Sequence, residues 1–480
     1  MPRIVTLCVA LALLPIGVRA VEPATATNIP QAAINAAGEL RERALNDDVA
    51  YALVDDLTTR IGPRLAGGEN DLAAREWMIA KFKALGFDKV WTEPVSYPKW
   101  VRRSESAAIV APFAQSLAAT ALGYSAATPP GGLDAEVIGF DSLDAMKAAP
   151  DYQVKGKIVY LGIPRMRALS DGRDYGTGST VRVTGPELAA AKGAVAFLLR
   201  SVGSDNNRLA HTGVTHFTDP AKAIPAAAIS NPDADLLDNM LKLGTPVKLH
   251  LALDCGIEGS YNGANVIAEI TGRSRPREYF LTGGHLDSWD LGTGAIDDGA
   301  GVAITTAAAH LIGQLRERPA RSIRVVAFAN EESGLFGGKA YATQNHNEIG
   351  KAILGAESDG GADRIFKLTA TVKPEARAAI GQIAAALAPL GIEYDANAPG
   401  SGGSDLSAVH AVGMAGLSLH QDTTRYFDWH HTANDTLDKI DPVQLRQNVA
   451  AYAVAMFLAA SAEGDFGSAA DAFADDKGEH

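Results

Sequence analysis

Apolar positions near the start of the chain recur with a helical period. Val49, Leu53, Leu57 and Ile61 follow one another at intervals of four, which predicts an amphipathic helix. Residues 72–85 predict a second helix, and Gly86 marks its end. Residues 90–95 are typical of a strand. The N-terminal part of the chain is therefore expected to be mostly helical.

From residue 262 onward, apolar strand-like runs alternate with Ala-rich helical segments. This alternation predicts an α/β fold, with a mostly parallel central sheet and helices on both faces. The expected strands are 266–270, 278–282, 322–329, 352–357 and 413–419, and the expected helices are 298–315, 339–345, 374–390 and 441–460.

The middle of the chain has a different pattern. Short β-rich runs (136–140, 157–161, 194–199, 226–229 and 247–253) alternate with turns, and one Ala-rich helix is expected near residues 187–192. We interpret this region as an inserted, mainly β domain. The expected layout is a signal peptide (1–20), a leader with the N-terminal part of the main domain (21–105), the insertion (106–254), the main domain (255–463) and a flexible tail (464–480).

The first twenty residues are typical of a secretory signal peptide. Arg3 precedes an apolar run from Ile4 to Ile16, and Val18 and Ala20 supply the small residues that a signal peptidase requires. This apolar run is shorter than the roughly 20 residues that span a bilayer, and no later stretch is long enough. We therefore expect a secreted or periplasmic protein with no membrane partner.

The net charge argues against a nucleic-acid partner, and the cysteine content argues against an internal disulfide. The net charge is −13, from 43 basic and 56 acidic residues, and no Lys/Arg run stands out, so no nucleic-acid partner is expected. Cys8 lies in the expected signal peptide, which leaves Cys255 without a disulfide partner. Cys255 is expected to be a small buried residue and not a nucleophile.

Chemically capable side chains follow the first expected strand of the main domain. His285 and Asp287 come directly after residues 278–282, where the carboxyl ends of parallel strands form a crevice. Asp297 and Asp298 come next, beside an expected helix start. Helix capping satisfies one of these two carboxylates at most, and a cation held with His285 would account for the other.

Three more clusters follow along the chain. Glu331 and Glu332 come after the apolar strand 322–329, where buried carboxylates are costly unless they are paired or bind a metal. Asp359 follows the next strand, and His430 and His431 precede the last helix. The adjacent histidines leave open which of the two is a ligand.

These side chains indicate a metal site. Nitrogen and carboxylate ligands without thiolate fit zinc, with manganese or cobalt as alternatives. Five ligands exceed what one catalytic zinc takes from protein, and they suit two ions about 3.5 Å apart that share one carboxylate.

The motifs resemble those of the dizinc exopeptidase family, which includes bacterial leucyl aminopeptidases, glutamate carboxypeptidase and the transferrin receptor. The matching stretches are Gly-His-Leu-Asp, Asp-Asp-Gly-Ala-Gly, Asn-Glu-Glu-Ser-Gly, Glu-Ser-Asp-Gly and His-His-Thr-x-x-Asp-Thr. Residues 283–301 (GGHLDSWDLGTGAIDDGAG) resemble its plasma glutamate carboxypeptidase branch, carboxypeptidase Q. The resemblance is strong over residues 262–460 and weaker elsewhere, and the position of the insertion is similar to that of a protease-associated domain.

The resemblance implies two zinc ions and a role for each ligand. Asp297 would bridge the ions and would be joined to the next residue by a cis peptide bond. His285 and Asp359 would hold one ion, while Glu332 and His431 would hold the other, because the family's ligand directly precedes Thr or Ser.

The same resemblance implies catalytic roles. Glu331 would be the general base that activates a water between the ions, and Asp287 would orient His285. His430 falls where some relatives carry a Tyr, which suggests a role in oxyanion stabilisation. Ser404 and Asp405 match a substrate-side motif, so they are expected to contact substrate.

Several residues have weaker assignments. Asp422 and Arg425 lie upstream of the histidine pair and suit either a peptide terminus or surface salt links. No metal-ligand role is expected for the remaining histidines, including His211 and His250.

The expected function is an exported zinc exopeptidase that hydrolyses dipeptides or short peptides from a free end. The resemblance leaves aminopeptidase, carboxypeptidase and dipeptidase open, and it allows a homodimer that no residue tests. Two alternatives use the same fold: glutaminyl cyclase chemistry with one zinc, and a receptor that has lost its peptidase site. Because all five ligands and Glu331 are present, the second alternative is disfavoured.

Overall fold

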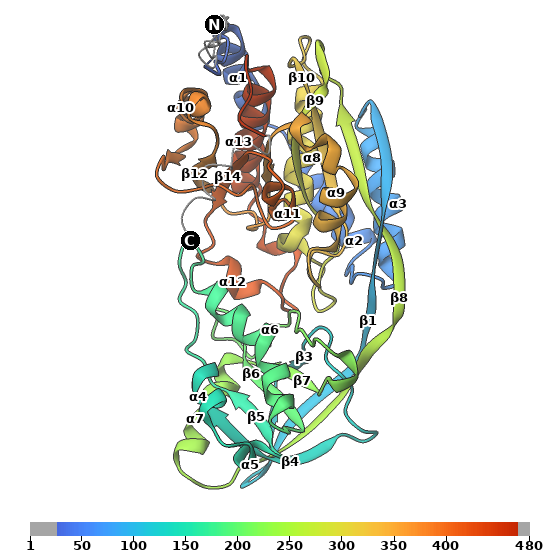
Figure 1. The fold of residues 1–480 in the computed structure, drawn as a ribbon, viewed down its shortest axis with the longest axis vertical. Coiled ribbons are helices and arrows are strands. Elements are labelled where there is room, and N and C mark those ends of the chain that lie inside the picture. Colours follow the sequence, from blue (N-terminus) through green and yellow to red (C-terminus); the bar gives the residue numbers. More distant parts are fainter. Residues whose placement is uncertain (1–25, 469–480) are drawn as a thin grey trace, which may run out of the picture.

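The computed structural model describes residues 26–468. Within that range the chain forms two lobes, as Figure 1 shows. The large lobe contains both ends of the described chain, and the small lobe is built from the middle of the sequence. The expected signal peptide (1–20), the first residues of the leader and the end of the tail lie outside the described residues.

The large lobe is built on a mixed sheet with a parallel centre. Its strand order is β13-β12-β14-β11-β9-β10-β8, and β1 pairs with β8. The pairs β14–β11, β11–β9 and β9–β10 are parallel, whereas β12–β14, β10–β8 and β8–β1 are antiparallel. The strands are β1 (Lys89–Ala111), β8 (Lys248–Ile270), β9 (Arg275–His285), β10 (Arg321–Phe328), β11 (Ala352–Glu357), β12 (Ile365–Thr371), β13 (Glu393–Tyr394) and β14 (Gly416–Gln421).

Helices cover both faces of this sheet, as predicted. Alternate residues of β9 point to opposite faces, so Phe280 joins one apolar cluster while Tyr279 and Leu281 join another. The helices packed into the first cluster are α1 (Gln31–Ala44), α2 (Val49–Arg60), α3 (Glu69–Ala84), α8 (Ala300–Gly313), α10 (Arg377–Leu387) and α13 (Pro442–Ser461), and those in the second are α9 (Phe336–Gln344) and α11 (Ser407–Ala411).

The strand order creates a crevice beyond the end of β9. From β9 the chain passes to β10 on one side and then crosses back to β11 on the other. Ligands of open α/β sheets bind beyond the carboxyl ends of strands at such a reversal. The fold therefore places the residues after β9, β10 and β11 around one opening.

The small lobe is also an α/β unit, so the expectation of a mainly β insertion is wrong. Its strands β4 to β7 pair in parallel, and β3 joins β7 antiparallel. Its elements are β2 (Gln115–Leu117), β3 (Ala119–Ala121), β4 (Leu133–Phe140), β5 (Ile158–Leu161), β6 (Ala196–Arg200), β7 (Ala226–Ile229), α4 (Leu143–Ala148), α5 (Asp151–Val154), α6 (Tyr175–Ala191) and α7 (Asn231–Lys242).

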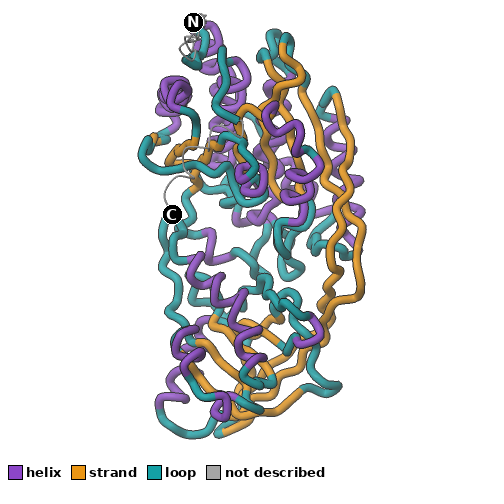
Figure 2. The backbone as a smooth tube through the Cα atoms, viewed as in Figure 1, coloured by secondary structure: helices purple, strands orange, loops and turns teal. Residues whose placement is uncertain are grey.

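Two long strands join the lobes. The strands β1 and β8 have 23 residues each, pair antiparallel along their length and run through both lobes (Figures 1 and 2). The proposed insertion bounds at residues 106 and 254 fall inside these strands. The small lobe is thus connected to the large lobe by a ladder of backbone hydrogen bonds whose register shifts at three points.

Part of the expected leader and part of the expected flexible tail belong to the fold. Residues 31–37 of the expected leader lie in α1, which packs against α13. At the other end, Phe466 is fully buried, and Arg321 donates hydrogen bonds to the carbonyls of Ala462 and Gly464. No helix between residues 26 and 468 is long and apolar enough to cross a membrane.

Candidate metal centre

Five of the predicted ligands converge at the crevice. His285 is the last residue of β9, Glu332 follows β10 and Asp359 follows β11. Asp297 precedes α8, and His431 lies in the loop after α12 (Tyr426–Trp429). Four of these side chains are buried, and the Asp359 side chain is 17% exposed.

Asp297 lies at the centre of the cluster. Its Oδ1 is 3.2 Å from His285 Nε2, which is 3.7 Å from Asp359 Oδ1. Its Oδ2 is 3.3 Å from His431 Nε2, which is 2.9 Å from Glu332 Oε2. The two oxygens of one carboxylate therefore face two different His–carboxylate pairs.

Asp298 binds backbone N–H groups beside the start of α8, which leaves Asp297 to face the histidines. Asp298 Oδ1 accepts a hydrogen bond from Gly301 N at 3.0 Å, and its Oδ2 accepts one from His285 N at 3.1 Å. The peptide bond between Asp297 and Asp298 is cis, as the family resemblance implied. The two adjacent carboxylates therefore have different interaction partners at the start of α8.

Each proposed histidine ligand is oriented through Nδ1. His285 Nδ1 donates to the carbonyl of Asp287 at 3.0 Å, and His431 Nδ1 donates to the carbonyl of Thr212 at 3.2 Å. A hydrogen bond at Nδ1 leaves Nε2 as the lone-pair nitrogen available to a cation. Thr212 belongs to the small lobe, so both lobes contribute to the cluster.

His430 also lies in the cluster, but no hydrogen bond at Nδ1 orients its ring. Its Nε2 is 3.4 Å from Asp297 Oδ2, its ring stacks on His431 with centroids 3.5 Å apart, and its Nδ1 has no hydrogen-bond partner. Burial, together with the neighbouring His431 ring, holds the pKa of His430 well below its usual range. The geometry favours His431 over His430 as the ligand.

Glu331 and Asp287 lie at the rim of the cluster. The backbone N–H of Glu331 donates to Asp287 Oδ1 at 3.1 Å, and the Glu331 side chain is half-buried. Burial raises the pKa of Glu331 well above its usual range, and the nearby carboxylates of Asp359 and Glu332 add to this effect. Burial also raises the pKa of Asp287 to about 7. His285 Nδ1 donates to the backbone carbonyl of Asp287 and not to its carboxylate, because Asp287 Oδ1 is 3.8 Å from that nitrogen.

The donor set fits divalent zinc. Asp297 Oδ2 and Glu332 Oε1 are buried without a hydrogen-bond partner, an arrangement that is costly unless a cation satisfies them. Ligand atoms of His285, Asp297 and Asp359 lie within 4.8 Å of one another, and so do those of Asp297, His430 and His431. Imidazole nitrogens with carboxylate oxygens are the ligands of catalytic zinc sites.

Ser404 and Asp405 lie behind the ligands. Ser404 Oγ donates to Asp359 Oδ2 at 2.9 Å. Asp405 is fully buried and accepts a hydrogen bond from Gly338 N, while its own N–H donates to Glu357 Oε2 at 2.8 Å. Direct substrate contact by Asp405 is incompatible with this burial. Arg425 pairs with Asp363, which agrees with the surface-salt-link interpretation of that residue.

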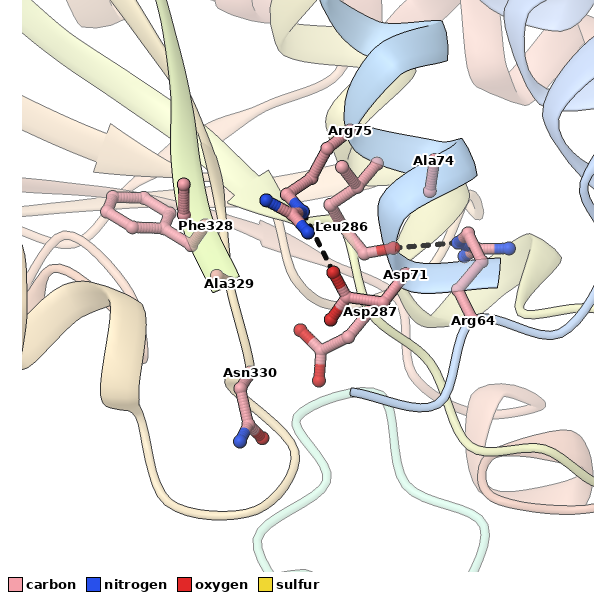
Figure 3. A pocket seen from close by; sticks show the side chains of 10 residues that line it. Arg64, Asp71, Ala74, Arg75, Leu286, Asp287, Phe328, Ala329 and Asn330 are labelled. Carbon is pink, nitrogen blue, oxygen red and sulfur yellow. Dashed lines mark hydrogen bonds and ion pairs between the residues drawn. The ribbon is translucent and has the colours of Figure 1, made fainter. Parts of the chain in front are cut away.

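Arg64 is a structural residue of the site that the sequence did not indicate. It is fully buried, and its guanidinium donates to the carbonyls of Leu286, Thr293 and Gly294 on the loop that joins His285 to Asp297. Figure 3 shows Arg64 beside a pocket where Asp71 and Arg75 of α3 face Asp287. No local motif marks Arg64, because these three carbonyls lie more than 220 residues away.

The small lobe adds an aromatic wall to the site. The ring of Tyr175 stacks on Phe427 with centroids 4.9 Å apart and meets His430 edge-on at 5.0 Å. Its hydroxyl accepts a hydrogen bond from the buried Arg182 at 3.0 Å. The sequence did not indicate these contacts either, since no motif surrounds either residue.

Comparison with known proteins identifies the family. Residues 265–456 match the model described as peptidase family M28. Human carboxypeptidase Q is 33% identical over 444 residues, which cover 92% of this chain and 91% of the human protein.

The chain belongs to peptidase family M28. A peptidase M28 precursor from Shewanella amazonensis is 45% identical, with a TM-score of 0.88 over 91% of this chain and 98% of that one. A zinc aminopeptidase from Bacillus subtilis shares the fold at 18% identity, with a TM-score of 0.59 over 85% and 94% of the two chains. The M28 match includes all five predicted ligands.

Proposed function

We propose that this M28 chain is an exported zinc exopeptidase that hydrolyses dipeptides or short peptides from a free end. The observation that carries the proposal is the Asp297 carboxylate, whose two oxygens face two separate His–carboxylate pairs. Family membership, the likeness to carboxypeptidase Q and the buried unpaired carboxylate oxygens support it.

The proposed site holds two zinc ions. His285 and Asp359 would hold one, Glu332 and His431 would hold the other, and Asp297 would bridge them. When bound, the ions supply Lewis-acid charge, which lowers the pKa of water and polarises the scissile carbonyl. The three carboxylates of Asp297, Glu332 and Asp359 supply three negative charges against the four positive charges of two divalent ions.

Glu331 is proposed to be the general base. Its half-buried carboxylate stands at the rim, where a water and a substrate reach it and where burial raises its pKa above the usual range. A carboxylate oxygen of Glu331 accepts a proton from the attacking water and then donates it to the leaving amine nitrogen. Asp287 holds both partners in place, His285 through its carbonyl and the Glu331 backbone through its carboxylate.

His430 is proposed to donate a hydrogen bond to the oxygen of the tetrahedral intermediate. It lies beside Asp297, and its Nδ1 has no competing protein partner. A buried donor aimed at a developing negative charge is worth about 3–4 kcal/mol in enzymes of this kind. Ser404 is proposed to act through Asp359 and not by substrate contact, because its hydroxyl is bonded to that carboxylate.

The test uses one set of dipeptides with matched side chains: both ends free, N-blocked and C-amidated. Each is incubated with the protein as isolated, after chelation and after zinc is restored. We expect cleavage that chelation abolishes and zinc restores, and the blocked end that prevents cleavage separates aminopeptidase, carboxypeptidase and dipeptidase. Absence of cleavage by zinc-loaded protein across the set would contradict the proposal.

A further inference from the structure

A segment of the small lobe docks directly on the histidine loop. Ser204 N donates to the Phe427 carbonyl at 3.1 Å, and Ser204 Oγ donates to Asp428 Oδ1 at 2.8 Å. Further along, Thr212 N donates to the His431 carbonyl at 3.0 Å. Residues 204–212 therefore follow residues 427–431 along their length, although they are more than 200 positions apart in sequence.

At the centre of this contact lies a buried Asp–His pair. His211 and Asp205 have side chains 0% and 1% exposed, and His211 Nε2 is 2.7 Å from Asp205 Oδ1. His211 Nδ1 is 2.7 Å from the carbonyl oxygen of His430. The carbonyl and the carboxylate are both acceptors, and each faces one ring nitrogen. Asp205 thus orients His211, and His211 holds the peptide unit between His430 and His431.

The His211 ring is fixed from every side. Its backbone N–H donates to Ser201 Oγ at 2.9 Å, and the second oxygen of Asp205 accepts from Asn207 N at 2.7 Å. A Cβ at Gly203 would lie 2.2 Å from His211 Cε1, so only glycine fits beneath the ring. This packing leaves no freedom for the ring to turn away from the His430 carbonyl.

The held peptide has an unfavourable conformation. His431 has φ 62°, in the left-handed region that costs a non-glycine residue about 1 kcal/mol or more. Such a conformation persists only when surrounding contacts determine it. Three hydrogen bonds do so here: His211 to the His430 carbonyl, Thr212 N to the His431 carbonyl, and His431 Nδ1 to the Thr212 carbonyl.

We propose that Asp205 and His211 are positioning residues through which the small lobe sets the orientation of His431 for zinc binding. The inference rests on the proposed function, and it makes the small lobe an integral part of the metal site. The contacts that orient His431 are the same contacts that dock residues 204–212. By thermodynamic linkage, zinc bound at His431 therefore also stabilises the docking of residues 204–212.

Two near-isosteric variants separate the two hydrogen bonds of His211. In His211→Asn the amide nitrogen replaces Nδ1 and keeps the donor to the His430 carbonyl. In His211→Gln the amide nitrogen replaces Nε2 and keeps only the bond to Asp205. The matched control is His250→Gln, whose amide nitrogen replaces Nε2 and so breaks the Nδ1 bond to Asp134 on the same lobe, where His250 is half-buried and Asp134 is exposed.

The main readout is the zinc affinity of the chelated protein, measured by competition with a chromophoric chelator. We expect His211→Gln to weaken the affinity for at least one zinc by about 10–100-fold, the usual cost of losing support behind a metal ligand. His211→Asn and the control are expected to stay within about threefold of wild type. Equal affinity in wild type and His211→Gln, or equal losses in the Asn and Gln variants, would overturn the proposal.

A second measurement needs no variant and covers the case in which His211→Gln fails to fold. Amide hydrogen exchange of the wild-type protein is followed with and without zinc. Linkage predicts that zinc slows exchange in the peptide spanning residues 204–212, and that the peptide around Asp134 and His250 is unchanged. Zinc binding without any added protection at 204–212 would contradict the inference while leaving the proposed function intact. A wild-type protein that binds no zinc would contradict the proposed function itself.

Discussion

Replacing Arg64 by methionine tests whether this buried side chain builds the metal site. Arg64 is fully buried and makes four hydrogen bonds, to the carbonyls of Gly62, Leu286, Thr293 and Gly294 at 3.1, 2.7, 2.6 and 2.8 Å. Arg64→Met keeps most of the volume but leaves these carbonyls without their donor.

The expected cost follows from those contacts. A hydrogen bond from a charged group contributes about 1.5–3 kcal/mol, and such contributions do not add fully within one network. We therefore expect Arg64→Met to lower the free energy of unfolding by about 3–5 kcal/mol. Because m-values increase with chain size, this loss corresponds to a urea midpoint roughly 1 M lower.

The assay is urea unfolding of chelated protein, so that zinc binding does not mask the difference. The control is Arg60→Met on the neighbouring helix α2, where the arginine side chain is 74% exposed and pairs with Asp56. An exposed ion pair of this kind contributes about 0–1 kcal/mol. An Arg64→Met midpoint equal to that of Arg60→Met would refute the reasoning.

Three further predictions concern single side chains. Glu331→Gln should lower kcat by about 10²–10⁴-fold with full zinc content, and a loss below tenfold would exclude general-base catalysis by Glu331. His430→Phe should lower kcat while metal analysis finds zinc unchanged; loss of zinc would make His430 a ligand. Burial raises the pKa of Cys255 to about 11, so below that pH the thiolate is scarce and iodoacetamide at pH 8 should leave this residue unmodified until the protein is unfolded. Mass spectrometry of the Cys255 peptide checks this, and rapid modification of the folded protein would contradict it.

The ligand cluster was accessible from sequence because three of its members directly follow strands of one sheet. A regular strand–helix alternation placed His285, Glu332 and Asp359 at the same edge, and the structure brings them together with Asp297 and His431. The central strands and helices were predicted for the same reason, since their periodicity is strong over many residues.

Contacts between distant segments could not be predicted. Arg64 and His211 are isolated residues in sequence, and the carbonyls that they bind at the metal site lie about 220 positions away. The start of α6 was missed because its glycines, threonines and a proline have low helix propensity, which packing against the small-lobe sheet overrides. Asp405 was expected to contact substrate. The folded chain buries it, and its Oδ1 accepts a hydrogen bond from Gly338 N of α9, a contact that the sequence alone does not indicate.

The most direct test of the central claim is a zinc titration of the chelated protein, with hydrolysis of an unblocked dipeptide as the readout. We predict no hydrolysis without metal, and a rise in activity that ends at two equivalents of zinc per chain. Full activity at one equivalent would contradict the bridging role of Asp297, and absence of hydrolysis at any zinc concentration would contradict the assignment as a zinc exopeptidase.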